Sequence, residues 1–403
     1  MDKNNKNNIV IATFFIIYIF ATMFFTIKEN YTKIKETSKT VIYNPDKLKY
    51  KDRVDLFKSS NESVFANNLA LKYDYIDTYG LFQKVLFKKV VSDAGVGKDV
   101  IKLSNGNLSF AYPDTDEMYW IDKLSIVNEY TKEKGIYMAF AIAPWSISEE
   151  AKLPFYVKDN LGEVRSKFVF NSLDKGINII DLQNELTTDP SNWFFRTDHH
   201  WTIDTAFESY KIIANHLDKE LDLNITDKYY NDFNRTMYPN AFLGSYGKRV
   251  GKYYAKPDDF EYIYPNFDTN FDVVNSEWDV MTSHYVGDFR HSIAYEEYLT
   301  MDIDDARETS IYYTYTNGGR ALVQINNLDP INNKKILILK DSYGEPVFAF
   351  LSLVFKEVRA VDVRCWANIN LKKYIDDYNP DAVLFIHTPS SLYDKKLINF
   401  KWE

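Results

Sequence analysis

The sequence predicts an α/β fold with a mostly parallel sheet and helices on both of its faces. Short apolar runs, typical of buried strands, alternate along the chain with amphipathic helical patterns. This alternation favours a parallel sheet, whose ligands bind at the carboxyl ends of the strands. The chain has 403 residues, of which 45% are hydrophobic and 26% charged, so it can bury a large core and is not disordered in bulk.

Individual elements follow from the local patterns. Apolar runs predict strands at 136–143, 177–181, 335–340, 358–362 and 382–387. Amphipathic patterns predict helices at 117–132, 203–217, 345–355 and 371–378. Between 221 and 330 helical periodicity gives way to Tyr, Phe, Asp and Asn, which predicts a long insertion of loops and short strands.

The N-terminal segment predicts attachment to a membrane. Residues 9–27 form an uncharged apolar run of roughly nineteen residues, and about twenty residues cross a bilayer as a helix. Lys3 and Lys6 precede the run, which predicts that the N-terminus is inside and the body of the protein outside. A cleaved signal peptide is the alternative. We therefore expect a single-pass anchor at 1–27, a Lys-rich juxtamembrane spacer at 28–61 and an extracytoplasmic domain at 62–403.

Charge and cysteine content exclude several classes of function. The 48 basic and 57 acidic residues give a net charge of −9, which disfavours nucleic acid as a partner. Cys365 is the only cysteine, so the chain has no internal disulfide and no Cys-based zinc cluster. No motif indicates a cofactor.

Ser342 is a candidate nucleophile. It lies in the motif Lys-Asp-Ser-Tyr-Gly at 340–344, between an expected buried strand and an expected helix. Unpaired N–H groups at a helix start stabilise an oxyanion, so a serine at this position suits acyl transfer. An ordinary N-cap is the alternative, because Asp and Ser are both common there.

Asp198, His199 and His200 form a second candidate group. An Asp two residues before a His can bond one imidazole nitrogen and leave the other free to accept a serine proton. A structural histidine cluster and part of a metal site are the alternatives. The other histidines lie in no ligand motif, so we expect no metal.

Taken together, these motifs resemble those of a known family. The run Asp198-His199-His200-Trp201 and the downstream Asp341-Ser342, with 142 residues between His200 and Ser342, are similar to the pattern of DHHW proteins. These are permuted SGNH-hydrolase-like proteins of polysaccharide O-acetylation, related to alginate O-acetyltransferases. The resemblance covers roughly residues 73–387 and implies a flavodoxin-like parallel sheet with a permuted order of catalytic residues.

The resemblance also implies roles for the three central residues. Ser342 would be the nucleophile, His200 the general base and then acid, and Asp198 the residue that orients His200. His199 occupies the adjacent family position and receives no base role.

Four further residues are candidates for substrate or oxyanion contacts. Arg364 would line the site, with an ion pair to Asp362 as the alternative. Gly244 and Ser245 would supply a second oxyanion donor, with a plain turn as the alternative. Tyr343 follows the nucleophile directly.

The function implied is an extracytoplasmic O-acetyltransferase that acts on an exopolysaccharide or cell-surface glycan. Its implied partners are a membrane-bound O-acyltransferase, which supplies acetyl groups, and the polysaccharide acceptor. Two alternatives stay open: a carbohydrate esterase with the same residues, and a non-catalytic polysaccharide-binding scaffold in an export complex.

Overall fold

The computed structural model describes residues 3–42, 69–92, 98–277, 280–304, 307, 309–318, 320–366, 369–398 and 400–402. The chain divides into two compact units, Met1–Phe82 and Gln83–Glu403.

The first unit contains one long helix, α1 (Lys3–Ile42), and most of α3 (Lys72–Val85). Helix α1 covers most of the expected anchor and the first part of the expected spacer; residues 43–61 of that spacer lie outside the described residues. Among the residues that the structure describes, no helix is both long and apolar enough to cross a membrane. The anchor and the domain boundaries at 27 and 61 therefore stay predictions.

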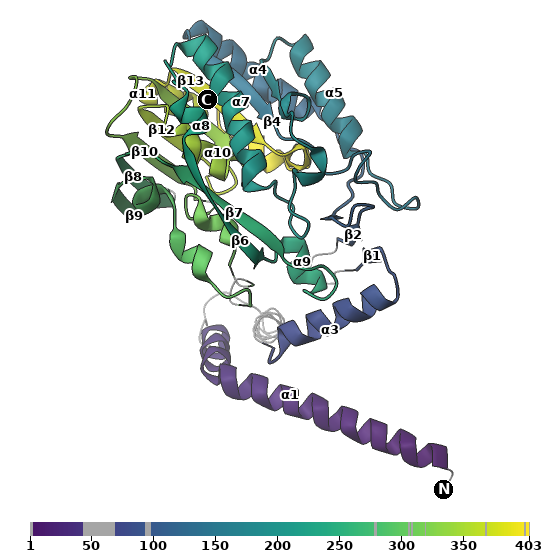
Figure 1. Cartoon of the computed structure of the whole chain (residues 1–403). Helices are drawn as coiled ribbons and strands as arrows, with labels where there is room; N and C mark the ends of the chain where they lie inside the picture. The colour runs from purple at the N-terminus through teal and green to yellow at the C-terminus, as the bar shows by residue number, and fades with distance from the viewer. Residues whose placement is uncertain are drawn as a thin grey trace. The chain divides into compact units, whose positions relative to one another are not determined.

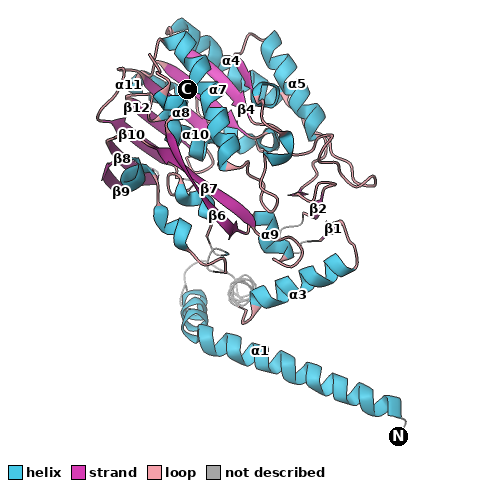
Figure 2. Ribbon diagram, viewed as in Figure 1, coloured by secondary structure: helices cyan, strands magenta, loops and turns pink. Residues whose placement is uncertain are grey.

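The second unit is built around an eight-stranded sheet in the order β5-β4-β13-β11-β12-β10-β8-β9 (Figures 1 and 2). The first five strands in this order are parallel to one another. Their bounds are β5 Ile179–Asp181, β4 Tyr137–Ile142, β13 Ala382–His387, β11 Lys335–Lys340 and β12 Glu357–Val361. All of them fall within a residue or two of the apolar runs that predicted them.

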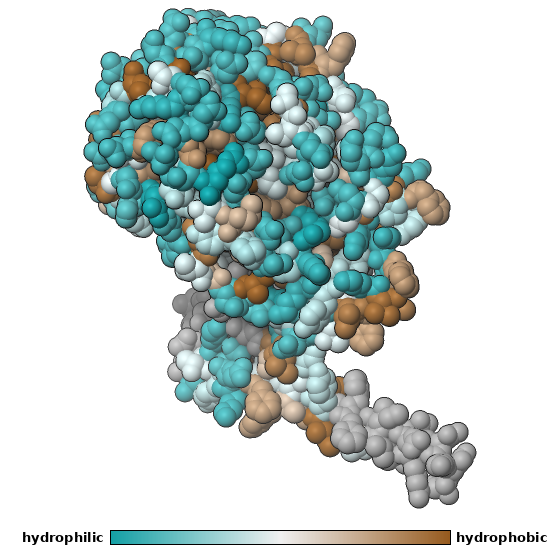
Figure 3. Space-filling view, in the orientation of Figure 1, coloured by the Kyte–Doolittle hydropathy of each residue, from teal (hydrophilic) through white to brown (hydrophobic). Residues whose placement is uncertain are grey.

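Helices cover both faces of this sheet, as expected for strands that are apolar on both sides. Ile336 and Ile338 of β11 face a core shared with α7 (Ile203–Leu221) and α10 (Gly344–Leu351). Leu337 and Leu339 face the opposite core, shared with α4 (Met118–Glu133), α5 (Leu161–Asp174) and α11 (Leu371–Tyr378). The surface of this unit that is visible in Figure 3 is mostly hydrophilic, with hydrophobic residues in small separate areas.

The expected insertion at 221–330 does not stand apart from the sheet. Its strands β8 (Phe271–Glu277), β9 (Val280–Gly287) and β10 (Leu322–Asn327) extend the sheet beyond β12 in antiparallel order. The sheet is therefore mixed: its parallel part agrees with the mostly parallel sheet that we expected, and the antiparallel strands beyond β12 are the correction to that expectation. The physical reason is that β10 buries Val323 and Ile325 beside β12, so an apolar antiparallel strand joins the sheet there without a helical crossover and pairs with β8 on its other side.

Shorter elements complete the unit. Strands β6 (Phe233–Phe242) and β7 (Asp258–Pro265) form a separate antiparallel ribbon, and β1 (Val90–Val91), β2 (Val100–Lys102) and β3 (Leu108–Ser109) a small sheet. The short helices are α6 (Leu182–Glu185), α8 (Lys228–Asn231) and α9 (Ser245–Val250). Single helical turns include η5 (Ile311–Thr314) and η6 (Pro389–Tyr393).

Candidate active site

Ser342 lies on a tight turn between β11 and α10, at the carboxyl end of a central strand. The neighbouring Asp341 fixes this turn, because its carboxylate accepts hydrogen bonds from Tyr343 N at 2.9 Å, Thr388 N at 2.8 Å and Ser391 Oγ at 2.6 Å. Position 344 requires glycine because its backbone packs closely against Lys340: a Cβ on Gly344 would lie 2.7 Å from Lys340 Cβ. The serine is therefore held in a rigid and partly exposed position.

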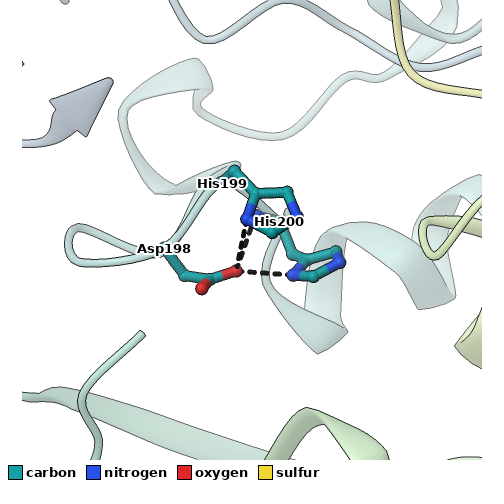
Figure 4. Close-up of side chains that lie close together, drawn as sticks. All are labelled: Asp198, His199 and His200. Atoms are coloured by element: carbon teal, nitrogen blue, oxygen red, sulfur yellow. Dashed lines mark hydrogen bonds and ion pairs between the residues drawn. The ribbon is translucent and has the colours of Figure 1, made fainter. Parts of the chain in front are cut away.

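Asp198, His199 and His200 come from the loop that precedes α7. Figure 4 shows both imidazoles directed at the same carboxylate oxygen of Asp198. The distance from Asp198 Oδ1 to Nδ1 is 2.5 Å for His200 and 3.6 Å for His199. His200 is therefore the hydrogen-bonded partner of Asp198, and His199 Nδ1 instead lies 2.8 Å from Ser245 Oγ.

The fold brings Ser342, His200 and Asp198 into one hydrogen-bonded chain. His200 Nε2 lies 2.7 Å from Ser342 Oγ, while its Nδ1 bonds Asp198. Both ring nitrogens are thereby assigned: Nδ1 carries the proton toward the carboxylate, and Nε2 is free to accept the serine proton. This arrangement can activate an alcohol nucleophile.

Asp198 is held in its charged form. Burial by itself would raise the pKa of its carboxyl, but His199, His200 and the Ser245 N–H lower it well below the usual range. Ser245 N donates to Asp198 Oδ2 at 2.5 Å. The carboxylate is therefore ionised at neutral pH and available to stabilise a His200 cation.

The turn at Gly244 and Ser245 supports this loop. Gly244 N donates to Thr197 Oγ1 at 2.9 Å, and a Cβ on Gly244 would lie 2.2 Å from Asp198 Cβ. The Thr197 hydroxyl in turn donates to the buried Asp258 at 2.5 Å. The two N–H groups that we considered as oxyanion donors are thus engaged in positioning Asp198. Ser342 N, by contrast, has no hydrogen-bond acceptor within the described part of the chain.

Arg364 and Tyr343 occupy different settings. Arg364 forms a two-pronged ion pair with the buried Asp362, at 3.0 Å from Nε and 2.7 Å from Nη2, as in the alternative that we considered. Tyr343 is buried, and its hydroxyl donates to the backbone carbonyl of His199. It therefore ties the serine turn to the histidine loop.

Residues 179–361 match the family model described as DHHW protein. The resemblance to DHHW proteins is confirmed. We call residues 179–361 the DHHW segment; it contains Asp198, His200 and Ser342, whereas Arg364 lies just beyond it. No curated protein matches this sequence.

Several solved structures have a fold similar to that of this chain. Bacillus cereus PatB1 is 21% identical with a TM-score of 0.60, and the match covers 74% of this chain and 99% of PatB1. A DHHW family protein from Eubacterium siraeum is 19% identical with a TM-score of 0.56, covering 77% of this chain and 96% of that one. A structure of PatB1 with a sulfonyl adduct, 21% identical, gives a TM-score of 0.57 and covers 74% and 98% of the two chains.

Tyr312 is a site residue of the DHHW segment that the sequence did not reveal. Its ring stacks on the His200 imidazole with centroids 4.0 Å apart and planes at 16°. It comes from η5, in the part of the chain that we expected to be an insertion. No local signal distinguishes it, since it is one of 31 tyrosines and carries no motif.

The alternative of a metal site involves the same three residues. Asp198, His199 and His200 each offer one ligand atom, and these atoms lie within 4.8 Å of one another. A metal ion ligated by His200 would displace the proton from Nδ1 or the Ser342 hydroxyl from Nε2. The hydrogen-bond pattern therefore fits a proton relay better than a ligand set.

Proposed function

We propose that this protein is an extracytoplasmic O-acetyltransferase that moves an acetyl group through a Ser342 acyl-enzyme to hydroxyls of an exopolysaccharide or cell-surface glycan. The observation that carries the proposal is the 2.7 Å contact between Ser342 Oγ and His200 Nε2, with His200 Nδ1 bonded to Asp198. Nucleophile, base and orienting carboxylate in this order are the requirements of covalent acyl transfer.

In the first half-reaction, Ser342 Oγ attacks the carbonyl carbon of an acetyl donor while His200 Nε2 takes the hydroxyl proton. The Ser342 N–H lies at the start of the turn into α10 and is free to donate to the developing oxyanion. Collapse of the intermediate breaks the bond to the leaving group, which receives the proton from His200. The products are acetyl-Ser342 and the protonated leaving group.

In the second half-reaction, a sugar hydroxyl takes the place of the leaving group. His200 Nε2 removes its proton, and the sugar oxygen attacks the acetyl carbon. The bond to Ser342 Oγ then breaks, and the serine regains the proton from His200. Asp198 stabilises the His200 cation in both steps because its own carboxyl is ionised.

The resemblance to DHHW proteins supports the choice of acetyl donor and glycan acceptor. By the same resemblance we propose that a membrane-bound O-acyltransferase supplies the acetyl group. The uncharged run at 9–27 supports an anchor at the membrane surface, as do the exposed side chains of Ile16, Phe20 and Phe24 in α1. Partition of the full chain into the membrane fraction, with loss of partition when 1–27 is deleted, tests this location.

The catalytic proposal is tested by covalent labelling of the full chain in detergent. The protein is incubated with an activated acetyl ester, and separately with a sulfonyl fluoride, a probe suggested by the sulfonyl adduct of PatB1. Intact mass measures the adduct, and peptide mapping locates it. Wild type is expected to be labelled on Ser342, and Ser342→Ala and His200→Ala are expected to lose the label.

Oligosaccharides added to the acetylated enzyme distinguish the remaining functions. Acetyl recovered on sugar supports the transferase, whereas acetyl released only as acetate would replace it with the esterase. Absence of any adduct from a panel of esters would overturn catalysis by Ser342 and leave the binding scaffold.

A further inference from the structure

Three cavities adjoin one another in the second unit, and the first of them lies beside the proposed catalytic residues. This first cavity, of about 230 Å³, is lined by His199, Ser245 and Tyr343 among others. His199 and Tyr343 are the chain neighbours of His200 and Ser342, and the ring centroids of His199 and His200 lie 3.9 Å apart. The first cavity is therefore close to the reacting groups, although neither His200 nor Ser342 lines it.

Shared lining residues place the three cavities next to one another in a row, and we refer to this row as the cleft. Trp145 and Ser146 line both the first cavity and a second one of about 220 Å³. Asn105, Asn107 and Phe194 line both the second cavity and a third one of about 590 Å³. The volume of the third cavity by itself is within the range of about 300–1,000 Å³ that is usual for small-molecule sites. A ligand that extends along all three cavities can therefore be longer than a single small molecule.

The lining chemistry suits sugar rings. In the first cavity Tyr112 and Trp145 meet edge to face with ring centroids 5.6 Å apart. Trp145 is buried, so the partly exposed ring of Tyr112 offers the apolar surface on which a sugar ring can pack. Between the second and third cavities, the side-chain amide of Asn107 makes no hydrogen bond to any described residue. A free amide can both donate to and accept from sugar hydroxyls.

The third cavity has an excess of negative charge. Its charged lining residues are Asp204, Asp258, Asp259, Glu261, Arg196 and Arg235. Arg235 is already paired, at 2.6 Å with Asp204 and 3.1 Å with Glu261. Asp259 is exposed and has no cationic partner among the described residues, because its carboxylate accepts only from Asn240 N. A carboxylate-bearing sugar would be repelled here.

We propose that this cleft binds an extended glycan acceptor, with the acetylated sugar in the first cavity, which is lined by Arg249 and by no acid. The sugars in the third cavity carry no carboxylates and are either neutral or amine-bearing. The inference rests on the proposed function and deepens it. It assigns Asn107 a role in binding the distal part of the chain and Asp259 a role in selecting against polyuronates.

The first experiment measures acceptor length. Full-length protein in detergent is given a small activated acetyl ester and glucose oligomers from the monosaccharide to the octasaccharide. The KM for the acceptor is expected to fall at least tenfold with length and then level off. Asn107→Ala is expected to raise the ratio of octasaccharide KM to monosaccharide KM by about 2- to 10-fold, the effect of one lost hydrogen bond. Asn333→Ala, an exposed asparagine outside the cleft, is the matched control.

The second experiment compares charge at constant length. Neutral oligomers, amino-sugar oligomers and oligouronates are offered as acceptors, and the oligouronates are expected to show at least tenfold higher KM. Asp259→Asn removes one charge but keeps an oxygen that can accept from Asn240 N. Asp259→Asn is expected to lower the ratio of the oligouronate KM to the neutral-oligomer KM by roughly 2- to 5-fold. Asp329→Asn, an exposed acid outside the cleft, is the control and leaves the discrimination unchanged.

The two proposals fail in different ways. A KM independent of length, or equal for oligouronates and neutral oligomers, would overturn the cleft while acetyl-Ser342 still forms. Absence of acetyl-Ser342 in the wild type would instead overturn the proposed function itself. A preference for the amine-bearing over the neutral oligomer identifies which of the two acceptor types the cleft selects.

Discussion

The phenol ring of Tyr312 lies flat on the imidazole of His200, with ring centroids 4.0 Å apart and planes at 16°. The Tyr312 hydroxyl accepts a hydrogen bond from Trp201 Nε1 at 3.2 Å, so the ring that covers His200 is itself fixed. Stacking on one face and hydrogen bonds at both nitrogens together leave His200 a single orientation, with Nε2 on Ser342.

Replacement of Tyr312 tests this positioning. An aromatic pair contributes about 0.5–1.5 kcal/mol, so Tyr312→Leu is expected to lower kcat roughly 2- to 10-fold. Tyr312→Phe keeps the ring and is expected to retain most of kcat, although Trp201 loses its acceptor. The measurement is the steady-state rate of acetyl transfer, which gives kcat and the KM for the acetyl donor. This KM is expected to be the same in both variants as in the wild type. A merely structural role would be indicated if Phe and Leu lowered kcat equally.

The two adjacent histidines should differ sharply in function. The His199 side chain is partly exposed and points to Ser245. Partial desolvation together with the neighbouring His200 lowers the pKa of His199 to about 4, so it is neutral at pH 7. His199→Gln is expected to keep acylation within about tenfold of wild type, whereas His200→Gln should lose about 10²- to 10⁴-fold. The rate of adduct formation checks this, and comparable losses for both would reassign the base.

Gly244 should tolerate no side chain. An alanine Cβ would lie 2.2 Å from Asp198 Cβ and must displace Asp198 from His200. Because a shift of about 1 Å can cost about 10²-fold in rate, Gly244→Ala is expected to lower kcat by about that factor. The control is Gly162→Ala, whose Cβ would have no neighbour closer than 3.9 Å. Wild-type kcat in Gly244→Ala would show that the loop adapts.

Asp341 should stabilise the fold in a pH-dependent way. Burial would raise the pKa of its carboxyl, but His387 and the Ser391 hydroxyl lower it below the ordinary value. A depressed pKa means that the carboxylate contributes stability above about pH 4, and that this contribution is lost as the pH falls. Asp341→Asn is therefore expected to lower the free energy of unfolding by about 1–3 kcal/mol at neutral pH and by less in acid.

Urea unfolding of Asp341→Asn and wild type at neutral pH and near pH 3 measures this difference. An equal difference at both pH values would mean that the carboxylate charge has no part in holding the serine turn.

The parallel half of the sheet could be predicted because its strands are apolar on both faces. The strands at 335–340 and 382–387 contain the uninterrupted apolar runs 336–339 and 382–386, and the structure places both strands in the centre of the sheet. The antiparallel half could not be predicted, since β9 is largely exposed and β8 alternates buried with half-buried residues. Such strands carry little hydrophobic signal, and their place depends on the pairing of β10 with β12.

The parallel strands, the helices between them and the two motifs that contain Asp198, His200 and Ser342 could all be predicted from the amino-acid sequence. This was possible because each of these features is local: an apolar period, a strand followed by a helix, or an acid two residues before a histidine. Three contacts depend on how the chain folds: His200 Nε2 lies against Ser342, Ser245 N donates to Asp198, and the Tyr312 ring covers the imidazole. These contacts join residues that are between 47 and 142 positions apart, and no local pattern encodes such a pairing.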